Sequence, residues 1–219
     1  MQTELKITED GSHTLFVPEI DECYHSTHGA IQESQHIFIE AGIKQCQKEK
    51  IKILEIGFGT GLNAFLTLLE AERSEKQIQY TSLELYPVEI EKALQLNYPE
   101  MLAPEKRLVF EEMHTAEWNI EIPISSFFKL IKIETDFTGY VLEEQFDVVF
   151  FDAFSPEKQP EMWSEVLFEK IYAHCNQGAV LTTYCAKGIV RRAMQAAGFV
   201  VDRLPGPPGK REMLRGKKS

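Results

Sequence analysis

A glycine-rich turn between an apolar segment and a helical one constrains this chain more than any other feature. The segment 51–56 (IKILEI) is short and apolar, and it is followed by Gly57, Gly59 and Gly61 at alternate positions. The pattern of residues 62–72 predicts a helix. Glycine lets a backbone turn tightly and approach a ligand without a Cβ clash. A strand, a glycine turn and a helix in this order predict the first unit of an α/β sheet that binds a nucleotide-like ligand.

The rest of the chain continues the alternation. Apolar segments predict strands at 78–85, 130–133, 146–151, 179–184, 199–204 and 210–214, and intervening segments predict helices at 88–97, 164–175 and 189–197. The last two strands are joined by residues 205–209 (PGPPG), too short for a parallel crossover, so the final strand must run antiparallel. We expect an α/β fold with a doubly wound, mostly parallel seven-stranded sheet and one antiparallel strand. Residues 1–50 would be an N-terminal extension packed on the core, residues 51–219 the main domain, and 101–128 an insertion.

The glycine turn fits S-adenosylmethionine better than a dinucleotide. A dinucleotide fingerprint is G-x-G-x-x-G, whereas here the third glycine comes one residue early and Leu62 takes its place. Glu55 would repel a pyrophosphate but could organise the methionine end of a cationic cofactor, and acids also follow the next two strands, where they could bind ribose hydroxyls and the adenine amino group. The predicted cofactor site lies at the carboxyl ends of the strands and comprises Glu55, Gly57, Phe58, Gly59, Gly61, Asn63, Glu84, Asp136 and Asp152.

Four stretches of the chain resemble one enzyme family. They are residues 54–63 (LEIGFGTGLN), 150–164 (FFDAFSPEKQPEMWS), 186–199 (AKGIVRRAMQAAGF) and 206–214 (GPPGKREML), with a weaker match at 24–39 that includes Glu33 and Ser34. These stretches resemble the tRNA 5-methylaminomethyl-2-thiouridine methyltransferases, which occur free-standing (MnmD type) and as one half of bifunctional MnmC. Thr135 departs from the family, which often has glycine before the adenine-side acid.

The resemblance implies a Rossmann-like class I methyltransferase fold and a specific reaction. A methyl group would pass from S-adenosylmethionine to the amine of 5-aminomethyl-2-thiouridine at the tRNA wobble position, giving 5-methylaminomethyl-2-thiouridine. The chain ends at Ser219 without an oxidoreductase half, so a separate oxidoreductase partner could supply the substrate.

The loop after the fourth strand carries the predicted catalytic group. Asp152 would orient the acceptor amine and take or relay its proton, and capping the next helix is its alternative role. Phe154 or Trp163 could stack on the uracil ring, although an anchor in the core is an equally expected role for Trp163. The predicted substrate-binding residues are Phe154, Ser155, Pro156, Lys158, Trp163, Lys187, Arg191, Lys210 and Arg211.

The distribution of charge bears on a tRNA partner. The net charge is −11, which argues against phosphate contacts, but residues 187–219 hold nine basic and two acidic residues, for a net of +7. The four cysteines contain no C-x-x-C pair and His25-x-x-His28 lacks an evident third ligand, so we expect no metal and a reducing cytoplasm. We expect neither a secretory signal nor a membrane span, because residues 1–10 are polar and apolar runs are short.

Two other functions remain open at this point. A small-molecule enzyme on the same fold, such as a polyamine-type aminopropyltransferase or methyltransferase, fits the acidic body but not the basic C-terminal segment. A catalytically silent RNA-binding or cofactor-binding subunit is disfavoured by the intact loop around Asp152.

Overall fold

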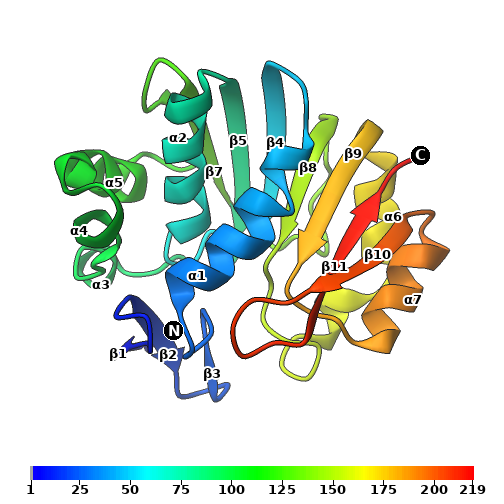
Figure 1. Cartoon of the computed structure of the whole chain (residues 1–219), viewed down its shortest axis with the longest axis horizontal. Coiled ribbons are helices and arrows are strands. Elements are labelled where there is room, and N and C mark those ends of the chain that lie inside the picture. The colour runs from blue at the N-terminus through cyan, green and yellow to red at the C-terminus, as the bar shows by residue number, and fades with distance from the viewer. Residues whose placement is uncertain (1) are drawn as a thin grey trace.

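The strands form one large and one small sheet in the computed structural model, which describes residues 2–219. The large sheet has the order β10-β11-β9-β8-β4-β5-β7-β6, and the small sheet has the order β1-β2-β3 (Figure 1). The strands are β1 (Glu4–Ile7), β2 (His13–Val17), β3 (Glu22–Cys23), β4 (Lys50–Ile56), β5 (Gln77–Glu84), β6 (Glu121–Pro123), β7 (Phe128–Glu134), β8 (Phe146–Phe151), β9 (Cys175–Thr183), β10 (Val200–Pro205) and β11 (Glu212–Lys217).

The large sheet confirms the predicted doubly wound architecture. Strands β4, β5, β7, β8 and β9 pair parallel, whereas β11 enters antiparallel beside β9 and forms a hairpin with β10. An eighth strand, β6, joins the edge of the sheet antiparallel to β7. This short strand lies in the segment that we predicted as an insertion, and its three residues are too few to give a clear alternating pattern.

The helices include the predicted ones at 62–72, 164–175 and 189–197, and further ones in the N-terminal segment and between residues 98 and 115. They are α1 (Ala30–Ser34), α2 (Leu62–Ser74), α3 (Ile90–Ala93), α4 (Tyr98–Leu102), α5 (Arg107–Thr115), α6 (Glu165–Ala173) and α7 (Gly188–Ala196), and α1 continues as a π-helical turn over Gln35–Glu40. The predicted helix at 88–97 is wrong in extent, because only α3 is helical there. Asn97 instead accepts a hydrogen bond from the His13 amide at 2.9 Å and donates to the Gly11 carbonyl at 3.0 Å, which ties this segment to the β1–β2 hairpin.

Both faces of the large sheet are covered, and each face has its own core. Successive residues of β8 point to opposite faces, so Val148 and Phe150 pack in one core while Val149 and Phe151 pack in the other. The first core also receives side chains from α1, α2 and α5, and the second receives side chains from α6 and α7. Within residues 2–219, no helix combines the length and the apolar character needed to cross a membrane.

The chain reverses its direction of winding between β4 and β8. Strand β5 lies on one side of β4, whereas β8 lies on the other, so two adjacent parallel strands send their following loops to opposite faces. A crevice outside the carboxyl ends of the strands is expected at such a switch point. The small sheet lies beside this end of the large sheet, toward which the arrow of β9 points in Figure 1.

Candidate active site

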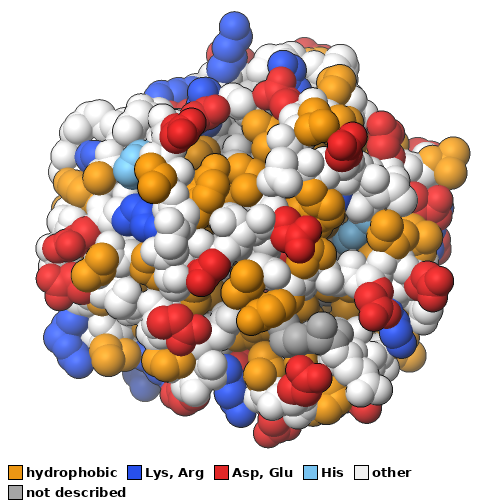
Figure 2. Space-filling view, turned by 180° about the vertical axis from the view of Figure 1, so that it is seen from behind, with side chains coloured by type: hydrophobic (Ala, Val, Ile, Leu, Met, Phe, Trp, Pro, Cys, Tyr) orange, Lys and Arg blue, Asp and Glu red, His pale blue; other side chains and the backbone are white. Residues whose placement is uncertain are grey.

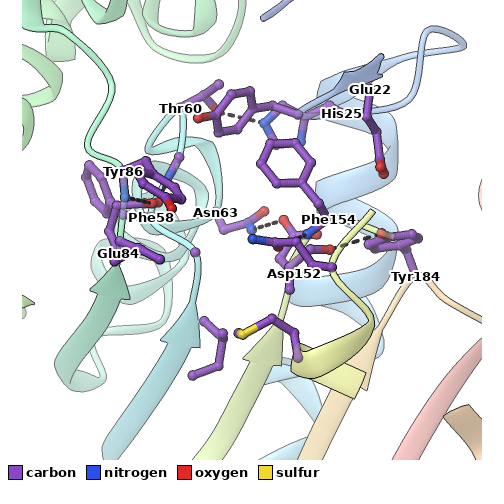
Figure 3. A pocket seen from close by; sticks show the side chains of 18 of the residues that line it. Glu22, His25, Phe58, Thr60, Asn63, Glu84, Tyr86, Asp152, Phe154 and Tyr184 are labelled. Atoms are coloured by element: carbon purple, nitrogen blue, oxygen red, sulfur yellow. Dashed lines mark hydrogen bonds between the residues drawn. The ribbon is translucent and has the colours of Figure 1, made fainter. Parts of the chain in front are cut away.

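A cavity of about 320 Å³ lies at the carboxyl ends of β4, β5 and β8. Its wall combines strand-end loops of the large sheet with the segment that follows β3 (Figure 3). The polar and aromatic residues that line it include Glu22, Tyr24, His25, Glu33, Phe58, Asn63, Glu84, Tyr86, Asp136, Asp152, Phe154, Tyr184 and Lys210. Of the predicted cofactor residues, the cavity brings together Gly57, Phe58, Gly59, Asn63, Glu84, Asp136 and Asp152.

The glycine turn passes very close to its neighbours, and this explains its composition. Gly59 has a φ of +49°, and a Cβ added there would come within 2.8 Å of the Tyr24 ring. A Cβ at Gly57, where φ is +94°, would lie 3.1 Å from the Asp152 carbonyl oxygen. Side chains are therefore excluded at both positions by backbone conformation and by space.

Two neutral histidines hold the turn from outside. The His25 Nε2 and Thr60 Oγ1 atoms lie 2.6 Å apart, and His114 donates from Nε2 to the Thr60 carbonyl at 3.1 Å. Burial lowers the pKa of His25 to about 4 and that of His114 to about 3, so both rings are uncharged near neutral pH. His28 pairs instead with Glu9, so the two histidines of the His25-x-x-His28 pattern serve different partners.

Glu84 connects the second strand to the turn. Its Oε2 atom accepts a hydrogen bond from the Gly59 amide at 2.9 Å, and its Oε1 atom accepts one from the Tyr86 amide at 2.8 Å. Burial raises the pKa of Glu84, and these backbone donors oppose the rise. The carboxylate is thus fixed at the cavity wall with lone pairs still free for ribose hydroxyls.

Asp136 lies at the end of the wall formed by β7. Its Oδ1 atom accepts hydrogen bonds from the Thr138 hydroxyl at 2.7 Å and the Thr138 amide at 2.8 Å. These bonds lower its pKa, so the side chain is a fixed carboxylate that can accept a hydrogen bond from an amino group.

The structure corrects the predicted roles of Glu55 and Gly61. Glu55 is fully buried under the turn, outside the cavity lining, where it accepts a hydrogen bond from Ser82 at 2.6 Å. Burial raises its pKa to about 8, so it is a largely neutral group of the protein interior. Gly61 opens α2, and a Cβ there would meet His114 rather than the cavity. Glu55 and Gly61 are close to the glycine turn in sequence, but neither residue lines the cavity.

Asp152 stands in the middle of the cavity, between the Glu84 side and the Tyr184 side (Figure 3). Its Oδ2 atom accepts a hydrogen bond from the Asn63 side chain at 2.8 Å. Burial raises the pKa of Asp152 to about 7, the nearby Glu33 carboxylate adds to the rise, and the bond from Asn63 opposes it. A carboxyl group that is about half ionised at neutral pH can both accept and release a proton.

The loop after β8 carries two aromatic residues that we predicted could stack on the uracil ring, and they lie in different environments. Phe154 lines the cavity and packs edge-on against Tyr24, with ring centroids 5.1 Å apart. Trp163 is only 4% exposed, packs against Phe151 and donates from Nε1 to the Phe154 carbonyl at 2.8 Å. The prediction that Trp163 stacks on a substrate is therefore wrong, and its core-anchor alternative is the observed role.

The other predicted substrate-binding residues of this loop before Trp163 lie outside the cavity lining, whereas Gln159 and Met162 of the same loop belong to it. Ser155 binds Glu22 through both its amide at 3.0 Å and its hydroxyl at 2.8 Å, so it fixes the loop against β3. Pro156 and Lys158 are outside the lining, and Lys158 is exposed. The predicted direct contacts of these three side chains with a substrate in the cavity are not formed by this arrangement.

The predicted basic residues fall into two groups. Lys210 enters the cavity, where it forms an ion pair with Glu33, whereas Lys187 pairs with Glu157 at the surface. Arg191 is half-buried on α7 and Arg211 is exposed beside Lys210. The structure thus places only one of the four inside the site.

Many lining residues were not predicted as site residues, and five of these bear on the chemistry of the cavity. They are Glu22, Tyr24, His25, Glu33 and Tyr184. Four of them precede β4, in the segment that we expected to be an extension, so the N-terminal residues complete the cavity wall. The weak family match at 24–39, with its Glu33-Ser34 pair, covers Tyr24, His25 and Glu33, whereas it does not reach Glu22 or Tyr184.

The cavity offers the groups that S-adenosylmethionine requires. The Asn63 Oδ1 atom is buried and lacks a hydrogen-bond partner among the described residues, although the same side chain lines the cavity. A buried acceptor without a partner is rare and fits the cationic end of the cofactor, while Glu84 and Asp136 fit its ribose and adenine. The donor set and the glycine turn are therefore compatible with this cofactor.

Comparison with known proteins agrees with this assignment. The chain is 32% identical over 94% of its length to the tRNA 5-methylaminomethyl-2-thiouridine biosynthesis bifunctional protein MnmC of Cupriavidus metallidurans and 34% identical over 88% to that of Ectopseudomonas mendocina. It spans about a third of the length of each, 32% in both cases.

Solved structures show the same fold. The crystal structure of MNMC2 from Aquifex aeolicus has a TM-score of 0.80 at 26% identity, covering 98% of this chain and 70% of that one. Spermidine synthase from Thermotoga maritima has a TM-score of 0.61 at 13% identity, covering 100% of this chain and 72% of that one, which is a likeness of fold alone. A model of the family described as S-adenosyl-L-methionine-dependent methyltransferase matches residues 87–219. The chain belongs to this S-adenosyl-L-methionine-dependent methyltransferase family.

Proposed function

We propose that this enzyme methylates the primary amine of 5-aminomethyl-2-thiouridine at the wobble position of tRNA, giving 5-methylaminomethyl-2-thiouridine. The observation that carries the proposal is the position and ionisation of Asp152, a carboxyl group with a pKa of about 7 in the centre of a cavity that also holds Glu33 and Glu22. These three carboxyl groups, which lie apart from Glu84 and Asp136 of the predicted cofactor site, favour a cationic acceptor over an anionic or neutral one.

An alkylamine is mostly protonated near neutral pH, and only the neutral amine has the lone pair needed to attack a methyl group. S-adenosylmethionine supplies that methyl group when bound. In this proposal Asp152 accepts the proton of the ammonium group, which is supported by the 2.8 Å hydrogen bond through which Asn63 orients its carboxylate. Protein side chains therefore remove the proton and fix the direction of approach, which together account for much of the rate gain in such reactions.

The cavity also has aromatic walls for a nucleobase. Phe154 and Tyr24 form one aromatic pair, and Tyr184 is fixed by a hydrogen bond of 3.0 Å from its hydroxyl to the Ala153 carbonyl. Unstacked bases in single-stranded tRNA loops bind to such aromatic surfaces. We propose Phe154 as the side chain that stacks on the modified uracil, because it lines the cavity beside Asp152.

The names of the relatives support the tRNA substrate. MnmC proteins are named for the biosynthesis of tRNA 5-methylaminomethyl-2-thiouridine and are described as bifunctional. This chain matches about a third of their length, and we propose that this third performs the methylation step on a substrate that an oxidoreductase supplies. A tRNA substrate would also imply that the enzyme acts in the cytoplasm.

The surface charge predicts that tRNA binds through few phosphate contacts. On the face shown in Figure 2, acidic side chains are scattered and the lysines and arginines do not gather into one patch. The net charge of −11 opposes binding of a polyanion over a wide surface. Recognition would then depend on the modified base in the cavity, with the basic C-terminal segment as an accessory.

A methyl-transfer assay on several acceptors tests the proposal. The enzyme would be incubated with S-adenosylmethionine and bulk tRNA from a strain that lacks the activity, and the nucleosides would be identified by mass spectrometry. We expect 5-methylaminomethyl-2-thiouridine to appear with the wild type and to be strongly reduced with Asp152→Asn. Methylation or aminopropylation of a polyamine without any change in tRNA would contradict the proposal and favour a small-molecule enzyme.

A further inference from the structure

An ion pair inside the cavity joins two segments that are far apart in sequence. Glu33 lies on α1, and Lys210 lies in the loop between β10 and β11. The Lys210 Nζ atom donates a hydrogen bond to Glu33 Oε1 and lies 4.1 Å from the centre of the Tyr184 ring. The Glu33 side chain is 8% exposed and that of Lys210 is 30% exposed. The carboxylate of the pair is therefore buried, whereas the lysine side chain remains partly accessible to solvent.

The partners of the Lys210 ammonium group are fixed without it. Glu33 Oε2 accepts a hydrogen bond from the Ser26 amide at 2.8 Å, which orients the carboxylate. The Tyr184 hydroxyl is fixed by the Ala153 carbonyl, which orients the ring. The Glu33 carboxylate and the face of the Tyr184 ring both contact the same ammonium group. Together they form a binding site for a primary ammonium, because the negative charge and the π-face both attract it.

The head group of Lys210 is chemically the same as that of the proposed substrate. Both are a primary ammonium on a CH₂ group, and the Lys210 ammonium already lies in the cavity that contains Glu33 and Asp152. Glu33 raises the pKa of Asp152 and Lys210 lowers it, so the charges of the three groups influence one another. A substrate ammonium placed between Asp152 and Glu33 would supply the positive charge that Lys210 supplies in its absence.

Lys210 is also able to leave. Its side chain is flexible and partly exposed, and its loop is joined to β10 through Gly206, Pro207, Pro208 and Gly209. A lysine released from Glu33 at the mouth of the cavity would meet the phosphates next to the bound nucleoside. Exchange of one ammonium group for another leaves the number of charges in the cavity unchanged, which avoids the cost of an unpaired buried carboxylate.

We propose that Glu33 and Tyr184 form the subsite that binds the ammonium group of the acceptor, and that Lys210 occupies this subsite until the acceptor displaces it. The inference rests on the proposed function, and it assigns Glu33 as a positioning and specificity residue. It explains why a buried acid on α1 and a lysine of the C-terminal hairpin meet in the cavity. It also predicts selection of uridines that carry the amine over those that lack it.

Binding measurements with two forms of one tRNA test the subsite. The enzyme, saturated with S-adenosylhomocysteine to prevent turnover, would be titrated with tRNA carrying 5-aminomethyl-2-thiouridine and with the same tRNA carrying 2-thiouridine. We expect the wild type to prefer the amine by roughly tenfold or more, as one charge-assisted contact allows, and Glu33→Gln to lose most of that preference. Glu33→Gln should not weaken binding of the tRNA without the amine, because Lys210 is then free to meet its phosphates. In turnover, Glu33→Gln should raise KM more than it lowers kcat.

Glu144→Gln is the matched control, because Glu144 pairs with Lys52 at 2.6 Å but lies outside the cavity lining. It should keep the full preference for the amine. Equal weakening of both tRNAs by Glu33→Gln would mean that Glu33 has only a structural role, and an unchanged preference would mean that the amine binds elsewhere. Either result overturns the proposal.

A second measurement does not depend on tRNA. Lys210→Ala should leave the subsite open to a small amine, so butylammonium should raise the melting temperature of this variant by about 1 °C or more at concentrations well above its dissociation constant. The wild type and the double variant Lys210→Ala/Glu33→Gln should not respond. Equal responses of all three proteins would overturn the proposal. If the wild type methylated no tRNA while Lys210→Ala still bound the amine through Glu33, the proposed function would fail and the ammonium subsite would stand.

Discussion

The two sides of the cavity are built in different ways. On the cofactor side, the glycine turn and Glu84 follow β4 and β5 directly, and each ligand group lies within a few residues of a strand end. On the acceptor side, Glu33, Asp152 and Lys210 come from three segments that are more than fifty residues apart. The cofactor side is therefore encoded by local sequence, whereas the acceptor side exists only once the sheet and its N-terminal segment are assembled.

This difference also appears in the electrostatics. Glu84 and Asp136 are held by backbone amides or by a neighbouring threonine, which are fixed, neutral donors. Asp152 and Glu33 are instead close to each other and to Lys210, so their charges depend on one another. Fixed donors suit a cofactor that binds in one state, and coupled charges suit a proton that must move. Changes on the two sides should therefore affect different kinetic constants.

The largest expected effect is that of Asp152→Asn on the chemical step. Loss of the proton acceptor should lower the single-turnover rate by a factor of roughly 10²–10⁴, because general-base catalysis contributes that much. The amide keeps the size of the side chain, so tRNA and cofactor dissociation constants should change by only a few-fold. Asp136→Asn, on the cofactor side, is the control and should leave the saturated rate nearly unchanged. A rate for Asp152→Asn within a few-fold of wild type would show that Asp152 is structural.

The second effect is that of Glu84→Ala on cofactor binding. Removing the carboxylate leaves the Gly59 and Tyr86 amides without their acceptor and takes away the ribose partner. The dissociation constant of S-adenosylmethionine should rise by about 5- to 150-fold, which corresponds to roughly 1–3 kcal/mol. Calorimetry would measure it, and Glu33→Gln should bind the cofactor like the wild type. If Glu33→Gln weakened cofactor binding as much as Glu84→Ala, the separation of the two sides would be wrong.

The sequence predicted most of the fold because the fold has strong periodic signals. Apolar runs such as Phe146–Phe151 and the short link at 205–209 were sufficient to predict the parallel strands and the antiparallel β11. Less regular elements were missed for physical reasons. The β6 strand has three residues, and the segment at 88–97 is fixed by side-chain bonds from Asn97 that no periodicity reports.

The acids of the candidate site were predictable where they follow or end a strand. Glu84, Asp136 and Asp152 were found in this way, and all three line the cavity. Glu55 also adjoins a strand end, but its side chain points into the protein, because successive residues of a strand alternate between faces. Glu22 and Tyr184 were missed because only tertiary packing brings them to the cavity.

The third effect is the pH dependence of the methyl-transfer rate at subsaturating tRNA, which reports the ionisation of Asp152 before tRNA binds. The pKa of Asp152 is raised to about 7, so its carboxyl group is mostly protonated below that pH and cannot accept the proton of the amine. The rate should therefore rise by about tenfold between about pH 6 and pH 8 and then level off, as the ionised fraction of such a group does. Single-turnover rates across this range would test it. A rate that keeps rising above about pH 9 would show that the amine loses its proton to solvent and that Asp152 is not the acceptor.

The smallest effect concerns contacts outside both sides of the cavity. Lys210 pairs with Glu33 and Lys187 pairs with Glu157, whereas Arg192 and Arg211 are exposed. We therefore expect these two arginines to contact phosphates without first breaking an ion pair. Each phosphate contact contributes about 0.9 to the slope of log affinity against log salt concentration on duplex nucleic acid, and about 0.7 on single strands. Replacing Arg192 and Arg211 together by alanine should therefore flatten the slope by about one to two units, measured between about 50 and 200 mM salt.

The preference for the amine and the cofactor affinity should both be unchanged, because neither arginine lines the cavity. Since the protein as a whole is acidic, a loss of only one or two contacts should weaken tRNA binding measurably. A slope equal to that of the wild type would mean that tRNA approaches over another surface, and the basic C-terminal segment would then have no part in binding.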